Sequence, residues 1–232
     1  LPDYSNLNGV SAGLDFSIVA DMRNFLEDTE FKGAVASMAG VGAGVFIVSP
    51  GDIDPPDQVL ATIRAPLVFS SIPWLPVVGN HEAETPSDMA FLRSYGLAAQ
   101  ASAAGASNFA SGPSGAATTC YSFDAGGAHF AFINEYYDGS SDVGINPGPA
   151  DPLAGTISPA LLAWLEGDLV AAEARNPAYI FVFGHEPLYS LPDAATARVR
   201  HSGECLDAHP DEVRAFIALL KKHAVTAYVC GH

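Results

Sequence analysis

Positive charge is scarce in this sequence. Lysine and arginine together number 10 against 26 aspartates and glutamates, which gives a formal net charge of −16. Because nucleic acids and anionic membranes are themselves negative, such a surface repels both. We therefore expect no nonspecific binding to nucleic acid or to an anionic membrane. A small anionic substrate is still compatible with this charge if metal ions reverse the local field.

Cysteine is also rare. Cys120, Cys205 and Cys230 are the three cysteines, too few and too scattered for a disulfide framework or a zinc knuckle. Cys205 and Cys230 can form one bridge in an oxidising compartment, and burial as free thiols is the alternative. The sequence leaves both open.

Long hydrophobic runs are missing as well. No apolar run approaches the roughly 20 residues that a membrane-spanning helix needs, so we expect no membrane insertion. The chain starts with Leu1-Pro2-Asp3 and shows no signal peptide there, which fits a processed or trimmed start. At 232 residues and 49% hydrophobic content the chain can bury a sizeable core, and we expect a single domain over residues 1–232.

Polar side chains recur at the ends of predicted strands. The apolar run from Trp74 to Val78 is too short for a helix and stops at Gly79, where Asn80, His81 and Glu82 follow. Four other short apolar runs end in a potential metal ligand, namely Asp21, Asp52, His185 and His232.

These runs alternate with helical patterns. Apolar spacing predicts helices over residues 24–38, over 88–95, and from the Ser158-Pro159 and Pro210 starts, with a short helix capped by Asp57 or its neighbour. Strand and helix in alternation predict parallel pairing with right-handed crossovers. Because ligands bind at the carboxyl ends of the strands in such sheets, the polar ends predict a shared site.

The residue types at these ends indicate a metal centre. Nitrogen and oxygen donors of this kind suit borderline ions such as Zn, Fe or Mn. The predicted ligands are Asp21, Asp52, Asn80, His185 and His232. Glu82, Glu135 and Glu186 are candidate acceptors for histidine N–H groups.

Two further segments carry expectations. Residues 84–119 are rich in Ala, Ser and Gly, and a weakly patterned insertion of this length predicts a mobile segment or a lid. Residues 121–133 read as a β-hairpin with its turn at Gly126-Gly127. In this hairpin His129 alternates with core aromatics, so its side chain is expected to face outward.

The order of the short motifs resembles one family. Gly51-Asp52, Gly79-Asn80-His81-Glu82, Gly184-His185 and Gly231-His232, each after a strand, are similar to the motif series of calcineurin-like metallophosphoesterases, which include the purple acid phosphatases. The resemblance spans the chain from Asp21 to His232. Local stretches such as His185-Glu186-Pro187-Leu188-Tyr189 resemble secreted bacterial members.

The resemblance implies an α/β fold, a four-layer α/β/β/α sandwich that is C-terminally incomplete in this chain. It also implies two divalent or trivalent metal ions, Fe, Mn or Zn. In the family pattern Asp52 bridges both ions, and Asp21 binds one of them. The other ion is held by Asn80, His185 and His232. His81 resembles the family's leaving-group acid or phosphate contact.

The chain departs from the pattern in three places. Arg23 stands where many members have a metal-binding histidine, and arginine has no lone pair to donate. Pro55 stands where purple acid phosphatases have a tyrosine ligand, so the iron–tyrosinate centre is not expected. The sequence ends at His232, the first histidine of the family's Gly-His-x-His motif, and we expect a natural chain to continue. Arg23 and His201 are candidate substrate-binding residues.

The first functional hypothesis is a metal-dependent phosphoester hydrolase, acting on small phosphomonoesters or phosphodiesters through a metal-bridging hydroxide and exported by a bacterium to the periplasm or medium. Its chemistry agrees with the ligands, since two close metal ions clamp phosphoryl oxygens during in-line attack. A noncatalytic, metal-deficient relative acting as a binding module is the alternative. A metal-dependent hydrolase of other esters shares the same ligands.

Overall fold

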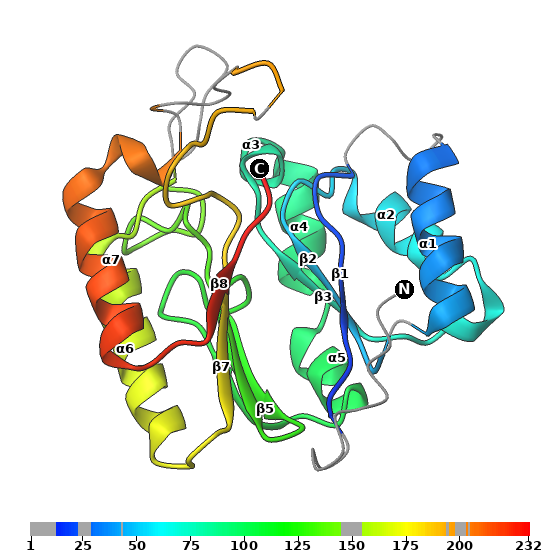
Figure 1. Cartoon of the computed structure of the whole chain (residues 1–232), viewed down its shortest axis with the longest axis horizontal. Coiled ribbons are helices and arrows are strands. Elements are labelled where there is room, and N and C mark those ends of the chain that lie inside the picture. Colours follow the sequence, from blue (N-terminus) through cyan, green and yellow to red (C-terminus); the bar gives the residue numbers. More distant parts are fainter. Residues whose placement is uncertain are drawn as a thin grey trace.

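The computed structural model describes residues 13–22, 29–42, 44–144, 155–193, 195–197, 203 and 205–232. Two sheets lie side by side in the middle of the molecule, with helices on their outer faces (Figure 1). The helix predicted over residues 24–38 is found as α1, Thr29–Val41. Residues 23–28 lie outside the described part of the chain.

The first sheet is parallel and contains three strands. They are β1 (Ser17–Ile18), β2 (Ile47–Pro50) and β3 (Trp74–Val77), in the order β1-β2-β3. Ile47 packs in the cluster under the outer helices, whereas the next residue, Val48, packs in the cluster between the sheets. Burial on both faces explains why these strands are continuous apolar runs without alternation.

The second sheet is mixed and contains five strands. They are β4 (Ser107–Ser111), β5 (Tyr121–Ala125), β6 (Ala128–Phe132), β7 (Tyr179–Phe183) and β8 (Ala227–Val229), in chain order across the sheet. Strands β5 and β6 form the predicted antiparallel hairpin, and β6, β7 and β8 run parallel. The carboxyl ends of β6, β7 and β8 therefore share one edge.

Helices cover both outer faces. On the first sheet lie α1, α2 (Pro56–Ile63) and α4 (Pro86–Ser94). On the second lie α6 (Pro159–Glu173) and α7 (Pro210–Lys222), which Figure 1 shows on the side opposite α1 and α2. The shorter elements are α3 (Asn80–Glu84), α5 (Leu97–Ala103) and the 3₁₀ turns η1 (Leu67–Phe69) and η2 (Leu206–Ala208).

Aromatic rings fill the space between the two sheets. Phe46, just before β2, packs edge-on against Phe123 and Phe130 of the second sheet, with ring centroids 6.0 and 5.4 Å apart. Phe132 stacks on Phe183 at 5.0 Å. Each such ring stabilises the fold by about 1.5–3 kcal/mol through burial. The layers are helix, sheet, sheet, helix, so the expected four-layer α/β/β/α arrangement is confirmed.

Helix starts follow the local sequence with one exception. Ser158 caps α6, because its hydroxyl accepts a hydrogen bond from the backbone N–H of Leu161 at 3.2 Å. The cap predicted at Asp57 or its neighbour is wrong. Pro55 occupies the N-cap of α2 without a side-chain hydrogen bond, and Asp57 lies inside the first turn, where its charge suits the helix dipole.

The segment at residues 84–119 is more ordered than its composition predicts. It contains α4, α5 and β4, and β4 pairs with β5 at the edge of the second sheet. Alanine suits helices, and small residues let α5 approach β3 closely. The helix predicted over residues 88–95 is found here as α4, whereas α5 and β4 were not predicted.

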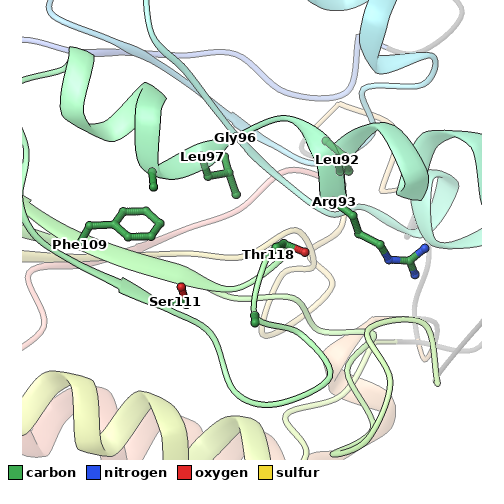
Figure 2. A pocket seen from close by; sticks show the side chains of 9 residues that line it. Leu92, Arg93, Gly96, Leu97, Phe109, Ser111 and Thr118 are labelled. Carbon is green, nitrogen blue, oxygen red and sulfur yellow. The ribbon is translucent and has the colours of Figure 1, made fainter.

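A cavity of about 160 Å³ lies within this ordered segment, between α4–α5 and β4 (Figure 2). Leu97, Phe109 and Arg93 are among the residues that line it, and the guanidinium end of Arg93 extends away from Leu97 and Phe109 toward another partner. That partner is Asp142, which accepts hydrogen bonds from the Arg93 guanidinium at 2.6 and 2.9 Å. The segment is thus tied to the loop after the hairpin.

His129 does not face solvent as predicted. Its side chain is fully buried on β6 and lies between Asp124 Oδ1 at 2.7 Å and Asp168 Oδ2 at 2.9 Å. The period-2 pattern placed His129 correctly on the face opposite Phe130, but α6 covers that face, and its Asp168 meets the ring.

None of the described helices has the length and apolar character needed to cross a bilayer. Among the described residues, all three cysteines are thiols. Of the two pairing states left open by the sequence, the structure thus has the unbridged one.

Candidate metal centre

The carboxyl ends of both sheets meet at one edge of the sandwich. Asp21 and Asp52 follow β1 and β2, Asn80 begins α3 after β3, and His185 and His232 follow β7 and β8. In Figure 1 the C-terminus lies beside α3 at this edge. The structure brings the five predicted ligands, from strands far apart in sequence, into one neighbourhood.

His185 lies at the centre of the group. Its ring is fully buried, and Nδ1 lies 2.8 Å from the backbone carbonyl oxygen of Pro50. A carbonyl only accepts, so Nδ1 carries a hydrogen, and when the ring is neutral Nε2 presents a lone pair. Nε2 lies 3.1 Å from Asn80 Oδ1 and 3.3 Å from Asp52 Oδ1.

Gly51 allows this approach. A Cβ atom at Gly51 would overlap Nδ1 of the His185 ring, and the residue has a φ of 81°, a conformation that glycine adopts without strain. The Gly-Asp motif thus needs glycine for the space beside His185 as well as for its backbone.

His232 meets His185 edge to face. Its Nδ1 lies 3.0 Å from His185 Nε2, and the two ring planes are 86° apart. The backbone N–H of His232 donates to both carboxylate oxygens of Asp21, at 2.8 and 3.0 Å. Asp21 is therefore joined to the chain end through the backbone, at the border of the group.

Asp52 is held in a strained conformation by a buried acid. Its φ is 53°, uncommon for a residue other than glycine. Glu82 accepts hydrogen bonds from the backbone N–H groups of Asp52, Ile53 and Gly79, at 3.0, 2.8 and 2.8 Å. Burial and the nearby Asp52 charge raise the pKa of Glu82. The predicted partner of Glu82, a histidine ring, is not the one observed.

The donor set suits a cation. Asp52, His185 and His232 each offer one ligand atom, and these atoms lie within 4.8 Å of one another. Lone pairs of the Asp52 carboxylate, the Asn80 amide oxygen and two imidazoles converge on one point, which is electrostatically unfavourable unless positive charge lies among them. Nitrogen and oxygen donors in this number fit a borderline divalent ion.

His81 lies beside the group and is accessible. Its Nε2 lies 3.8 Å from Asp52 Oδ2, and about a quarter of its side chain, 23%, is exposed. Its Nδ1 faces Glu84 at 3.8 Å. An imidazole in this position can exchange protons with solvent and with a molecule bound at the group. Arg23 and His201, the predicted substrate-binding residues, lie outside the described residues.

Glu135 and Glu186 are buried behind the histidines. Burial raises the pKa of Glu135 to about 7, and burial together with the Glu135 charge raises that of Glu186 to about 8. Both were predicted to accept hydrogen bonds from histidine N–H groups, and in the part of the chain that the structure describes only Glu135 does so, from the backbone N–H of His185. Glu186 accepts from the hydroxyl of Tyr136 and the backbone N–H of Gly155, both at 2.7 Å. Glu135 accepts from backbone N–H groups of the His185 loop and from Tyr228.

Sequence reasoning missed the tyrosines. Tyr136 lies in the polar segment after β6, and Tyr228 lies in the middle of β8. The sequence pattern assigned no role to either hydroxyl. The available signal was Glu135, an acid placed just after a strand. If it is buried, its carboxylate needs hydrogen-bond donors such as tyrosine hydroxyls.

Comparison with known proteins agrees with this geometry. The model of the calcineurin-like phosphoesterase family matches residues 25–232. Over 94 residues the chain is 32% identical to the tartrate-resistant acid phosphatase type 5 of Sus scrofa, a match that covers 40% of this chain and 23% of that protein.

A solved structure resembles the fold. It is a purple acid phosphatase isolated from yellow lupin (Lupinus luteus) seeds, with a TM-score of 0.52 at 15% identity, over 93% of this chain and 37% of that one. The matches thus span only 23% and 37% of the length of these two relatives.

Proposed function

Because the chain belongs to the calcineurin-like phosphoesterase family, we propose that it hydrolyses phosphate esters with bound divalent or trivalent metal ions. The observation that carries the proposal is the convergence of Asp52, Asn80, His185 and His232, with His185 Nε2 within 3.3 Å of the nearest ligand atom of each of the others. Small phosphorylated molecules are the proposed substrates.

The residues divide into two groups of ligands. Asn80, His185 and His232 would hold one ion, Asp21 the other, and Asp52 would contribute to both. Bound ions would supply Lewis acidity, which activates water and neutralises charge on a phosphoryl group. The fixed Asp52 backbone and the tautomer set by Pro50 keep the donor atoms of Asp52 and His185 aimed at the same point.

His81 is the proposed proton donor. The departing alkoxide of a phosphate ester needs a proton, and an imidazole near its ordinary pKa can deliver it at neutral pH. The carboxylates of Asp52 and Glu84 lie 3.8 Å from Nε2 and Nδ1 of this ring, respectively.

Metal analysis and hydrolysis together test the proposal. The purified protein, loaded with Mn²⁺, Zn²⁺ or Fe³⁺, should retain ions after gel filtration and hydrolyse p-nitrophenyl phosphate. Asp52→Asn should lower kcat/KM by about 100-fold or more, since the loss of a charged ligand removes several kcal/mol of transition-state stabilisation.

Asp57→Asn provides a matched control. It makes the same chemical change five positions along the chain, at an exposed residue in the first turn of α2, and should leave kcat/KM unchanged. Less than one retained ion per chain and no hydrolysis above the Asp52→Asn level would instead favour a noncatalytic relative. Location in the periplasm or the medium of a bacterium stays a prediction.

A further inference from the structure

Glu135 contacts the loop that carries His185 and the strand that leads to His232. It follows β6 by three residues and is fully buried. One carboxylate oxygen, Oε2, accepts two consecutive backbone N–H groups, those of His185 at 3.0 Å and Glu186 at 2.8 Å. Its carboxylate therefore fixes the peptide on both sides of the His185 α-carbon.

The other oxygen of Glu135 reaches the next strand. Oε1 accepts from the hydroxyl of Tyr228 at 2.5 Å, and that hydroxyl also lies 2.8 Å from the carbonyl oxygen of Glu186. Tyr228 belongs to β8, four residues before His232. A single side chain thus joins the loop that carries His185 to the strand that leads to His232.

The surrounding backbone packs closely around the contact between Glu135 and Tyr228. A Cβ atom at Gly184 would collide with the Tyr228 hydroxyl and with Glu135 Oε1. The backbone N–H of Gly231 donates to the carbonyl oxygen of His185 at 2.9 Å. The two histidine loops are therefore in register at the backbone, and the glycine before His185 is needed for the Glu135–Tyr228 contact.

We infer that Glu135 is a positioning residue for the metal centre: its carboxylate holds the His185 loop against β8, so that His185 and His232 present their ring nitrogens to the same ion. The inference rests on the proposed metal centre. Glu135 touches neither ring, so it acts through the backbone of one histidine and the strand of the other.

For Zn²⁺ binding, the structure predicts that the hydrogen-bonding shape of side chain 135 matters more than its charge. In Glu135→Gln the amide oxygen can accept from His185 and Glu186, and the amide NH₂ can donate to the Tyr228 oxygen. The Tyr228 hydrogen then turns to the carbonyl of Glu186, 2.8 Å away. Glu135→Ala leaves both N–H groups without this acceptor.

Zn²⁺ binding measured by calorimetry tests this without substrate. Glu135→Ala should weaken binding about 10- to 100-fold, the range typical of groups that orient metal ligands, whereas Glu135→Gln should stay within a few-fold of the original protein. Equal affinity in Glu135→Ala, or a loss in Glu135→Gln as large as in Glu135→Ala, would overturn the inference.

Amide hydrogen exchange of the metal-free protein provides a second readout. Exchange at His185 and Glu186 should speed up in Glu135→Ala and be restored in Glu135→Gln, while exchange at Val182, in the middle of β7, should not change. Unchanged exchange at His185 in Glu135→Ala contradicts the inference even if the protein binds no Zn²⁺.

Tyrosine variants decide the matter if Glu135→Ala fails to fold. Tyr228→Phe removes the hydroxyl that contacts Glu135, and Tyr137→Phe removes a buried hydroxyl that bonds the carbonyls of Ser114 and Gly139. Only Tyr228→Phe should weaken Zn²⁺ binding and speed up amide hydrogen exchange at His185. Equal effects of the two would refute the positioning role. A protein that binds Zn²⁺ as described but hydrolyses no phosphate ester refutes the proposed function alone.

Discussion

At the scale of single residues, the site depends on how closely backbone and side chains approach one another. Gly51 and Gly127 have nearly the same φ, 81° and 79°, but their surroundings differ. A Cβ atom at Gly51 would meet the His185 ring, whereas a Cβ atom at Gly127 would have nothing within 4 Å. Substitutions at the two positions therefore distinguish the effect of backbone strain from the effect of displacing the side chain of His185.

Gly51→Ala and Gly127→Ala should therefore differ in both stability and metal affinity. Gly127→Ala should lose roughly 1 kcal/mol of stability, because alanine is strained at positive φ. Gly51→Ala should lose more, because its Cβ also collides with the His185 ring and the Gly79 backbone. Only Gly51→Ala should also displace His185 and weaken Zn²⁺ binding by at least about tenfold. Urea denaturation and calorimetry measure the two quantities. Equal Zn²⁺ affinities for the two variants would show that the His185 ring tolerates displacement.

The role proposed for His81 predicts a dependence on the leaving group. His81→Ala should lower kcat/KM for an alkyl phosphate by about 10²–10⁴-fold, the range of general acid catalysis. The loss for p-nitrophenyl phosphate should be much smaller, because nitrophenolate departs without a proton. His209→Ala, at the start of α7, is the control. A loss that is the same for both substrates would assign His81 to binding.

Much of the site at this scale was predictable from the sequence. Asp52, Asn80 and His185 each follow a short apolar strand, and the strand ends meet as expected. The partners of Glu82 and Glu135 were not predictable, since nothing in the pattern distinguishes a carboxylate that accepts from a ring from one that accepts from backbone N–H groups.

At the scale of elements, the hairpin β5–β6 is joined to α6 by buried charge. His129 lies between Asp124 and Asp168, and Arg175 donates to Asp124 at 2.5 Å. Because ionised carboxylates only accept, both ring nitrogens of His129 carry hydrogen and the ring is charged. Ser122 adds a hydrogen bond to Asp168 at 2.6 Å. Helix α6 thus contacts the sheet through the Asp168–His129 ion pair as well as through its buried leucines.

This cluster predicts how stability depends on pH. Burial lowers the pKa of His129, but hydrogen bonds and charges from Asp168 and Asp124 outweigh it, so the pKa is raised. The contribution of a group whose folded pKa is raised is complete below its unfolded value, about 6.5, and is lost as pH rises through the folded pKa. Asp124 acts in the opposite sense at acid pH. Burial raises its pKa, but Arg175, His129 and Asn108 lower it overall.

His129→Gln tests the cluster. It should destabilise the protein by about 3 kcal/mol near pH 6, since it removes one partner of a buried ion group while Arg175 remains. The difference in the free energy of unfolding between this variant and the unmodified protein should shrink as the pH rises toward 9. Urea denaturation across this range measures it, with His209→Gln as the control. A difference that is constant or grows with pH would contradict a charged His129.

The sequence predicted most elements but not what covers them. Period-2 spacing located β5 and β6, and apolar spacing located α6 and α7. Whether a strand face meets solvent or a helix depends on tertiary packing, which is why His129 was assigned to the wrong environment. Helix α5 was not predicted for a related reason, because alanine-rich helices carry a weak apolar pattern and gain their stability from packing.

At the scale of the whole molecule, the two sheets contribute separate parts of the site. Asp52 and Asn80 belong to the β1-β2-β3 side, and His185 and His232 to the β7-β8 side. The four-layer order followed from the family resemblance, while the parallel strands followed from the alternation of elements. The contacts across the sheets, above all the aromatic layer, required the structure.

Bound metal should therefore stabilise the entire fold. At a free Zn²⁺ concentration 100 times the Kd, linkage predicts about 2.7 kcal/mol, which raises Tm by about 5–10 °C for a chain of this length. A chelator should reverse the shift, Asp52→Asn should abolish it, and Asp57→Asn should keep it. Thermal denaturation followed by circular dichroism measures these shifts. The same shift in Asp52→Asn would place the ion elsewhere.

The positions of Asp52 and His232 have one more consequence. An ion shared by these residues is a reversible cross-link that closes a loop containing most of the chain. Its contribution to stability then includes the entropy removed from the unfolded polypeptide, which grows slowly with loop length. Metal supply would accordingly decide how cooperatively the two sheets unfold, independently of any substrate.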